Sequence, residues 1–133
     1  MKIEDLEGVG PDHGAKLRAA HVQTTDHLLA MAGPAAGRRA LAESTGISAD
    51  LLLRWTNHAD LYRISGVGSE YADLLEASGV DSCPELAHRN AANLATTMAE
   101  ANAARQLVRR LPTEEMVADW IAQAAKLPKV VTH

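Results

Sequence analysis

The tripeptide Gly-Val-Gly occurs twice in this chain, at residues 8–10 and 66–68, and an apolar residue stands two positions before each copy. When the chain is shifted against itself by 58 residues, further positions coincide: Leu17 with Leu75, Ala19 with Ala77, Val22 with Val80, and Leu28 with Leu86. A looser match relates residues 47–55 to residues 112–120, and both segments end in tryptophan. We therefore predict two repeats, residues 1–62 and residues 63–133, that share one core.

Helix-favouring residues and helix-ending residues alternate along the chain. Hydrophobic residues make up 47% of the sequence, with two Trp, two Tyr and no Phe, so Ala and Leu dominate the expected core. Expected helix starts are at Pro11, Thr24 or Thr25, Pro34, Ser48, Ser82, Asn90 and Thr113, and expected ends lie near Ala20, Gly33, Gly46, Tyr62, Gly79 and Leu127. No stretch alternates with period two, so we predict no strand.

An apolar residue, Gly-Val-Gly and a following helix together resemble a helix-hairpin-helix element. The glycines permit a tight turn and let the backbone approach a ligand closely. The free N–H groups of the helix N-terminus then form an anion site, which binds DNA phosphate in known proteins of this kind. We expect Val9 and Val67 to pack between helices. The predicted fold class is all-α, with two helix-hairpin-helix-containing repeats packed as one compact domain.

The flanking residues favour the first hairpin as a phosphate site. Its candidate contacts are the backbone of Gly8, Val9 and Gly10 together with the side chains of Lys16 and Arg18. The second hairpin, Gly66, Val67 and Gly68, is followed by Glu70, whose carboxylate repels phosphate. Asp12 occupies the same place after the first hairpin. Either Gly-Val-Gly could instead be a tight turn without a ligand.

The densest basic cluster is Arg105, Arg109 and Arg110, in the segment that the second repeat has gained. If this segment is helical, Arg105 and Arg109 share one helix face. These residues are candidates for a phosphate or acidic-partner contact, but a solvated face that pairs with nearby acids is the favoured interpretation. The pair Arg38 and Arg39 is interpreted in the same way.

Trp55 and Trp120 are expected to be core anchors rather than stacking platforms.

Charge and composition narrow the function. The formal net charge is −4 and the sequence pI is about 5.8. Dedicated nucleic-acid-binding domains are commonly basic, so these values count against DNA binding as the only possible function. Cys83 is the single cysteine, so neither an internal disulfide nor a cysteine-based metal site can form. The six histidines show no metal-binding spacing. We predict no cofactor, no metal and no catalytic residue, and therefore no enzyme.

The N-terminal residues include no apolar signal region, and no apolar run approaches the ~18–20 residues that a membrane span needs. We therefore expect a cytoplasmic protein without membrane association.

Four segments resemble the bacterial family catalogued as domain of unknown function 4332: IEDLEGVGPDHGAKLRAAHVQTTDHLLA, LAESTGISADLLLRWTNHADLYRISGVGSEYADLLEASGVDS, LVRRLPTEEMVADWI and AAKLPKVV. The resemblance implies a tandem helix-hairpin-helix fold related to modules of DNA repair proteins. It supplies neither a reaction nor a ligand. Asp12 and Glu70 depart from the basic pattern of DNA-binding helix-hairpin-helix proteins.

Two functions remain open. The first is sequence-independent binding of DNA or another nucleic acid through the hairpin amides. The second is a protein-interaction scaffold, with a protein partner or a second copy of the chain as its ligand. The nearby cations of the first hairpin favour nucleic acid, whereas the acidic total charge favours a protein partner.

Overall fold

Helices make up all the regular structure of the computed structural model, which describes all residues 1–133. A short 3-10 helix, η1 (Ile3–Asp5), comes before eight α-helices. These are α1 (Gly10–Ala19), α2 (Thr25–Ala32), α3 (Ala35–Thr45), α4 (Ala49–Leu61), α5 (Ser69–Ala77), α6 (Cys83–Ala87), α7 (Ala91–Arg105) and α8 (Glu114–Lys126). One isolated β-bridge, between Lys2 and Thr24, is present and no strand is formed. The all-α prediction is confirmed.

Side chains cap the N-termini of four of the eight α-helices. Thr24, Ser48, Asn90 and Thr113 each accept a hydrogen bond, at 3.0–3.2 Å, from the backbone N–H three residues later. Each cap satisfies a donor that has no partner within its helix. All four residues had been predicted as helix starts from their chemistry alone.

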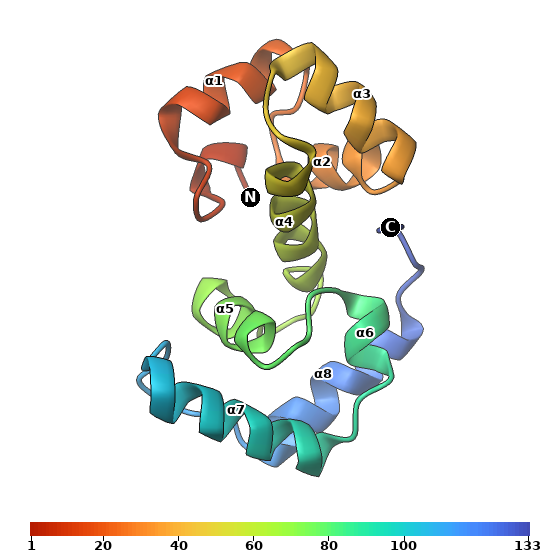
Figure 1. The fold of residues 1–133 in the computed structure, drawn as a ribbon. Helices are drawn as coiled ribbons and strands as arrows, with labels where there is room; N and C mark the ends of the chain where they lie inside the picture. Colours follow the sequence, from red (N-terminus) through yellow and green to blue (C-terminus); the bar gives the residue numbers. More distant parts are fainter. The chain divides into compact units, whose positions relative to one another are not determined.

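The chain divides into two compact units. Unit 1 comprises Met1–Asp60 and Lys129–His133, and unit 2 comprises Leu61–Pro128. Figure 1 shows α1–α4 in red to olive and α5–α8 in green to blue. The repeats predicted at 1–62 and 63–133, and the core that they share, stay predictions.

Within unit 1, η1 packs against α1, and α2 packs against α3. The segment Lys129–His133, here called the closing segment, belongs to this unit although it follows all of unit 2 in sequence. Thr132 donates its N–H to the carbonyl of Gly33 at 2.9 Å, and its hydroxyl accepts from the N–H of Ala35 at 3.1 Å. Val131 is 1% exposed. The closing segment is therefore part of the core of unit 1.

Arg38 explains how the closing segment is held. Its guanidinium donates to the carbonyls of Ala32 (3.0 Å) and Gly33 (2.6 Å), and also to the carbonyl of Thr132. Arg38 is 6% exposed, and its burial, with a smaller contribution from Arg39, lowers its pKa. The predicted solvated face is wrong for Arg38, because the free carbonyls at the end of α2 recruit its side chain. Arg39 is exposed.

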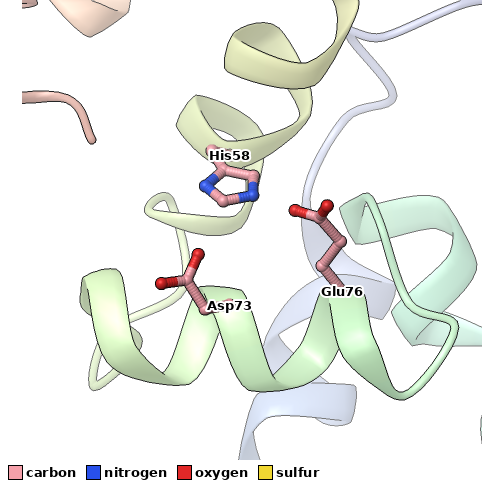
Figure 2. A group of neighbouring side chains, drawn as sticks. All are labelled: His58, Asp73 and Glu76. Carbon is pink, nitrogen blue, oxygen red and sulfur yellow. The ribbon is translucent and has the colours of Figure 1, made fainter. Parts of the chain in front are cut away.

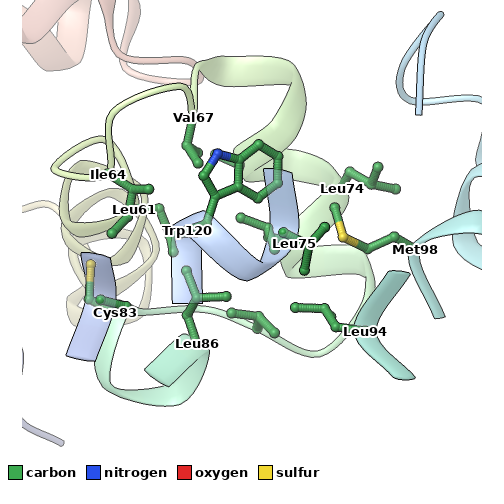
Figure 3. Packing of buried hydrophobic residues seen from close by; sticks show 14 of the residues in the cluster. Leu61, Ile64, Val67, Leu74, Leu75, Cys83, Leu86, Leu94, Met98 and Trp120 are labelled. Atoms are coloured by element: carbon green, nitrogen blue, oxygen red, sulfur yellow. The ribbon is translucent and has the colours of Figure 1, made fainter. Parts of the chain in front are cut away.

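Unit 2 has a core built around Trp120 of α8, with leucines contributed by α5, α6 and α7 (Figure 3). In this unit α8 packs against α6 and α7, and α7 packs against α5. Trp120 is 2% exposed. Cys83, the first residue of α6, is buried and forms no disulfide. The prediction that Trp120 is a core anchor is confirmed.

Candidate nucleic-acid interface

The first glycine of each hairpin lies against a tryptophan of its own unit. Gly8 and Gly66 have φ values of +88° and +96°. A Cβ on Gly8 would lie 3.3 Å from Nε1 of Trp55, and a Cβ on Gly66 would lie 3.1 Å from Nε1 of Trp120. Both the dihedral angle and the close approach therefore require glycine at these positions. Trp55 is also 2% exposed, so it too is a core anchor.

The middle valines are buried, as predicted, with Val9 at 2% and Val67 at 6% exposure. The third glycines differ. Gly10 has φ +67°, whereas Gly68 has an extended backbone, φ −103° and ψ −167°, and caps α5. The two hairpins consequently lead into their helices with different backbone geometry.

Arg18 is not available to bind a phosphate at the first hairpin, because it is paired with Glu4. Arg18 donates to both carboxylate oxygens of Glu4 in η1, from Nε to Oε2 and from Nη2 to Oε1 at 2.7 Å. These hydrogen bonds lower the pKa of Glu4 to about 2. Gly14 of α1 makes room for this contact, since a Cβ there would lie 2.8 Å from Cγ of Glu4. A cation proposed for phosphate is thus already paired with an internal carboxylate.

Other features also weaken the first hairpin. Pro11 is the second residue of α1 and has no N–H to donate. Asp12 places a carboxylate in the same turn. Nδ1 of His13 lies 3.1 Å from the carbonyl of Val9. Lys16 is exposed, and it is the remaining cation among those predicted for this site.

The second hairpin borders a pocket of about 390 Å³. Its lining consists of Gly66, Gly68, Ser69, Glu70, Tyr71, Arg109 and Arg110. Ser69, Glu70 and Tyr71 are the first residues of α5, and Gly68 gives them no side-chain cap. Their backbone N–H groups consequently have no acceptor within the helix. The pocket brings these donors together with two arginine residues, Arg109 and Arg110.

Arg109 and Arg110 lie in residues 106–113, here called the arginine loop, between α7 and α8. Both are exposed, and neither pairs with a carboxylate. The expectation that Arg105 and Arg109 share a helix face is wrong, because α7 ends at Arg105 and Gln106 adopts a left-handed φ of +51°. Arg105 is exposed and does not line the pocket.

Side chains from α5 and α8 hold the second hairpin in place. Gln123 accepts a hydrogen bond from the N–H of Ser65 at 2.8 Å and donates to its carbonyl at 3.2 Å. The ring of Tyr71 packs on Trp120 with centroids 5.2 Å apart. In unit 1, the ring of His13 stands 5.1 Å from Trp55. Each hairpin thus rests on a tryptophan that a ring from the following helix also contacts.

α5 carries three carboxylates and no basic side chain. Glu70 lines the pocket itself. Asp73 and Glu76, both labelled in Figure 2, lie further along the helix, one turn apart. The residues that line the pocket include two arginines and one glutamate, so their formal charges sum to a positive value, whereas that of the chain is negative.

Sequence reasoning singled out the second hairpin and the arginines separately but did not bring them together. The available signal was the position of the arginines in the segment gained by the second repeat. An inserted segment can add residues to the surface of a hairpin that it packs against in the fold. Which surface this segment reaches could not be predicted from the sequence, because that depends on where α7 ends.

The observed fold defines an all-α protein in which no helix is both long and apolar enough to cross a membrane. Residues 7–127 match the family described as "Domain of unknown function (DUF4332)", and the chain belongs to this family. No curated protein and no solved structure matches the chain.

Proposed function

We propose that this chain is a non-enzymatic module that binds nucleic acid without sequence preference, through the phosphate backbone, at the second hairpin. The observation that carries this proposal is the presence of Arg109 and Arg110 in the same pocket as Gly66, Gly68 and the first turn of α5. Backbone N–H groups and guanidinium groups are the donors that proteins most often direct at phosphate oxygens.

The proposal includes the interpretation of both units as helix-hairpin-helix repeats. It is supported by the contact that the two units have in common, a first hairpin glycine with positive φ against the indole nitrogen of a buried tryptophan. A hairpin fixed in this way keeps its backbone in one conformation. Its free N–H groups can then bind a phosphate without further ordering of the chain.

We expect the pocket to bind phosphate rather than base edges, because its backbone donors belong to a hairpin and a helix N-terminus. Its polar side chains are those of two arginines, one glutamate, one serine and one tyrosine. Contacts to phosphate fix position and carry no sequence information. Binding is therefore expected to be independent of sequence and to weaken as salt rises.

The preference for the second hairpin reverses the one drawn from sequence. Arg18 is paired with Glu4, and Pro11 removes one donor from α1. The second hairpin has three backbone donors and two arginines that pair with no carboxylate. Glu70 opposes binding, but it is a single charge against two.

For a protein-interaction scaffold, we would expect a contiguous exposed apolar patch. The exposed large apolar side chains are those of Met1, Met31 and Leu111. Apart from the acidic total charge, no observation favours this second candidate, and it enters as an outcome of the experiment below.

The test is fluorescence anisotropy with labelled 20-nucleotide single strands and 20-base-pair duplexes at low and physiological salt. We expect the double substitution Arg109→Ala and Arg110→Ala to weaken binding about tenfold or more. The matched control is Arg105→Ala, which removes an exposed arginine outside the pocket and should change affinity less than about twofold.

Two results would contradict the proposal. If the unmodified protein does not bind at low salt, nucleic acid is not its ligand and a protein partner becomes the leading candidate. If Lys16→Glu with Arg18→Glu abolishes binding while the Arg109 and Arg110 variant still binds, the site lies at the first hairpin.

A further inference from the structure

The arginine loop is fixed at two points by hydrogen bonds from neighbouring helices. Asn102 of α7 accepts from the N–H of Val108 at 2.9 Å and donates to its carbonyl at 3.2 Å. Tyr71 of α5 donates its hydroxyl to the carbonyl of Arg110 at 3.1 Å. The backbone is therefore held both immediately before Arg109 and at Arg110 itself.

The hydrogen bond of Tyr71 is the more informative of the two, because Tyr71 also belongs to the hairpin. It lies in the first turn of α5 and lines the pocket. Its ring packs on Trp120, the residue that lies against Gly66. A single side chain thus connects the hairpin, the first turn of α5 and the arginine loop.

We infer that the hydroxyl of Tyr71 is a positioning group that keeps Arg109 and Arg110 at the second hairpin, and that Asn102 supports the same arrangement from α7. This inference rests on the proposed function, since it concerns how that site reaches its affinity. Tyr71 acts on the ligand through the arginine backbone.

The physical basis is preorganisation. The arginine loop is not part of a helix, so its backbone has no regular hydrogen bonds to hold it. Without the bond from Tyr71, the loop would sample other conformations, and ligand binding would have to restrict it again. Affinity should fall even though no group that contacts phosphate has been removed.

The test compares Tyr71→Phe, which removes only the hydroxyl, with the unmodified protein and with Asn102→Ala. Tyr62→Phe is the matched control, since it also removes only a tyrosine hydroxyl, one that is hydrogen-bonded to Ser69 at 3.0 Å. A labelled 20-nucleotide oligothymidylate serves as the probe, with anisotropy recorded from 20 to 200 mM salt. Amide hydrogen exchange of residues 109–111 is measured without the probe.

We expect Tyr71→Phe to weaken binding about three- to tenfold, with faster exchange at residues 109–111 and unchanged exchange in α8. Asn102→Ala should act in the same direction, which keeps the test valid if one variant folds poorly. Tyr62→Phe should leave the exchange of residues 109–111 unchanged.

Failure of the inference can be distinguished from failure of the proposed function. If the unmodified protein does not bind the probe, both are overturned. If it binds through Arg109 and Arg110 but Tyr71→Phe changes neither affinity nor loop exchange, only the positioning role is overturned. Equal acceleration of exchange throughout α8 would show general destabilisation and would also overturn it.

Discussion

At the scale of single residues, the contact between Gly66 and Trp120 determines what the second hairpin can tolerate. Nε1 of the indole lies where a side chain at position 66 would begin. Gly68, two residues later, has open space around it and an ordinary φ. Glycine is therefore needed at position 66 by the positive φ and the nearby indole, whereas neither constraint applies at position 68.

Gly66→Ala should destabilise the protein by about 1–2 kcal/mol, because an L-residue with positive φ is strained and the added methyl would meet Trp120. Gly68→Ala is the matched control and should cost less, although its methyl would project at the edge of the proposed phosphate site. Denaturant titration followed by tryptophan fluorescence measures both. Equal losses of stability would contradict the argument.

The ion pair of Glu4 with Arg18 gives a pH dependence with a definite sign. The pKa of Glu4 is lowered from 4.5 to about 2 in the folded protein. A lowered carboxyl pKa contributes stability that is present above about pH 4.5 and is lost as pH falls towards 2. The side chains are partly exposed, so added salt should weaken the contribution.

We therefore expect the difference in Tm between the unmodified protein and Glu4→Gln to be largest near neutral pH and to shrink between about pH 4.5 and 2. Thermal unfolding across this range measures the difference. Asp5→Asn, which removes a neighbouring carboxylate that makes no ion pair, is the control. A difference independent of pH would mean that Glu4 acts through packing.

At the scale of elements, α2, α3 and the closing segment depend on one buried cation. Arg38 binds carbonyls at the end of α2 and in the closing segment, so its loss leaves several acceptors without a donor. Its neighbour Arg39 points outward from the same helix and is exposed. Substituting each arginine in turn therefore separates the effect of losing a buried side chain from the effect of losing a positive charge.

Arg38→Ala should lower the free energy of unfolding by about 1.5–3 kcal/mol, the usual cost of losing buried hydrogen bonds to a charged group. Arg39→Ala removes the same charge from the surface and should change stability by less than about 0.5 kcal/mol. Chemical denaturation of both variants provides the measurement. Similar values for the two would show that Arg38 does not hold the closing segment.

Element boundaries could be predicted from the sequence because they depend on local chemistry. Thr24, Ser48, Asn90 and Thr113 cap helices through atoms only three residues away. The roles of Arg18, Arg38 and Arg110 could not be predicted in this way. Their partners are Glu4, the closing segment and Tyr71, which are brought close by tertiary packing and leave no periodic signal in the sequence.

At the scale of the whole molecule, the formal charge of −4 and the small proposed phosphate site limit how steeply the affinity for nucleic acid can depend on salt. Long-range attraction cannot come from the total charge, so binding must depend on the local arginine pair. Two arginines correspond to few released counterions. Affinity should therefore vary less steeply with salt than it does for strongly basic DNA-binding domains.

The expected slope of log K against log salt is about −1.8 for duplex DNA and about −1.4 for a single strand, since each neutralised phosphate contributes ~−0.9 and ~−0.7. Anisotropy titrations between 20 and 200 mM salt give this value. The Arg109 and Arg110 double variant should approach zero slope. A slope of about −5 would reveal further cationic contacts that the proposal does not contain.

The closing segment also determines the order in which the molecule can be completed during translation. Residues 1–60 leave the ribosome first, but the partner of Arg38 and Gly33 is Thr132. Unit 1 therefore cannot form all its contacts until unit 2 has been synthesised. A chain that ends at residue 128 would contain all of unit 2 but an incomplete unit 1, and limited proteolysis of residues 1–128 compared with residues 1–133 would detect the difference.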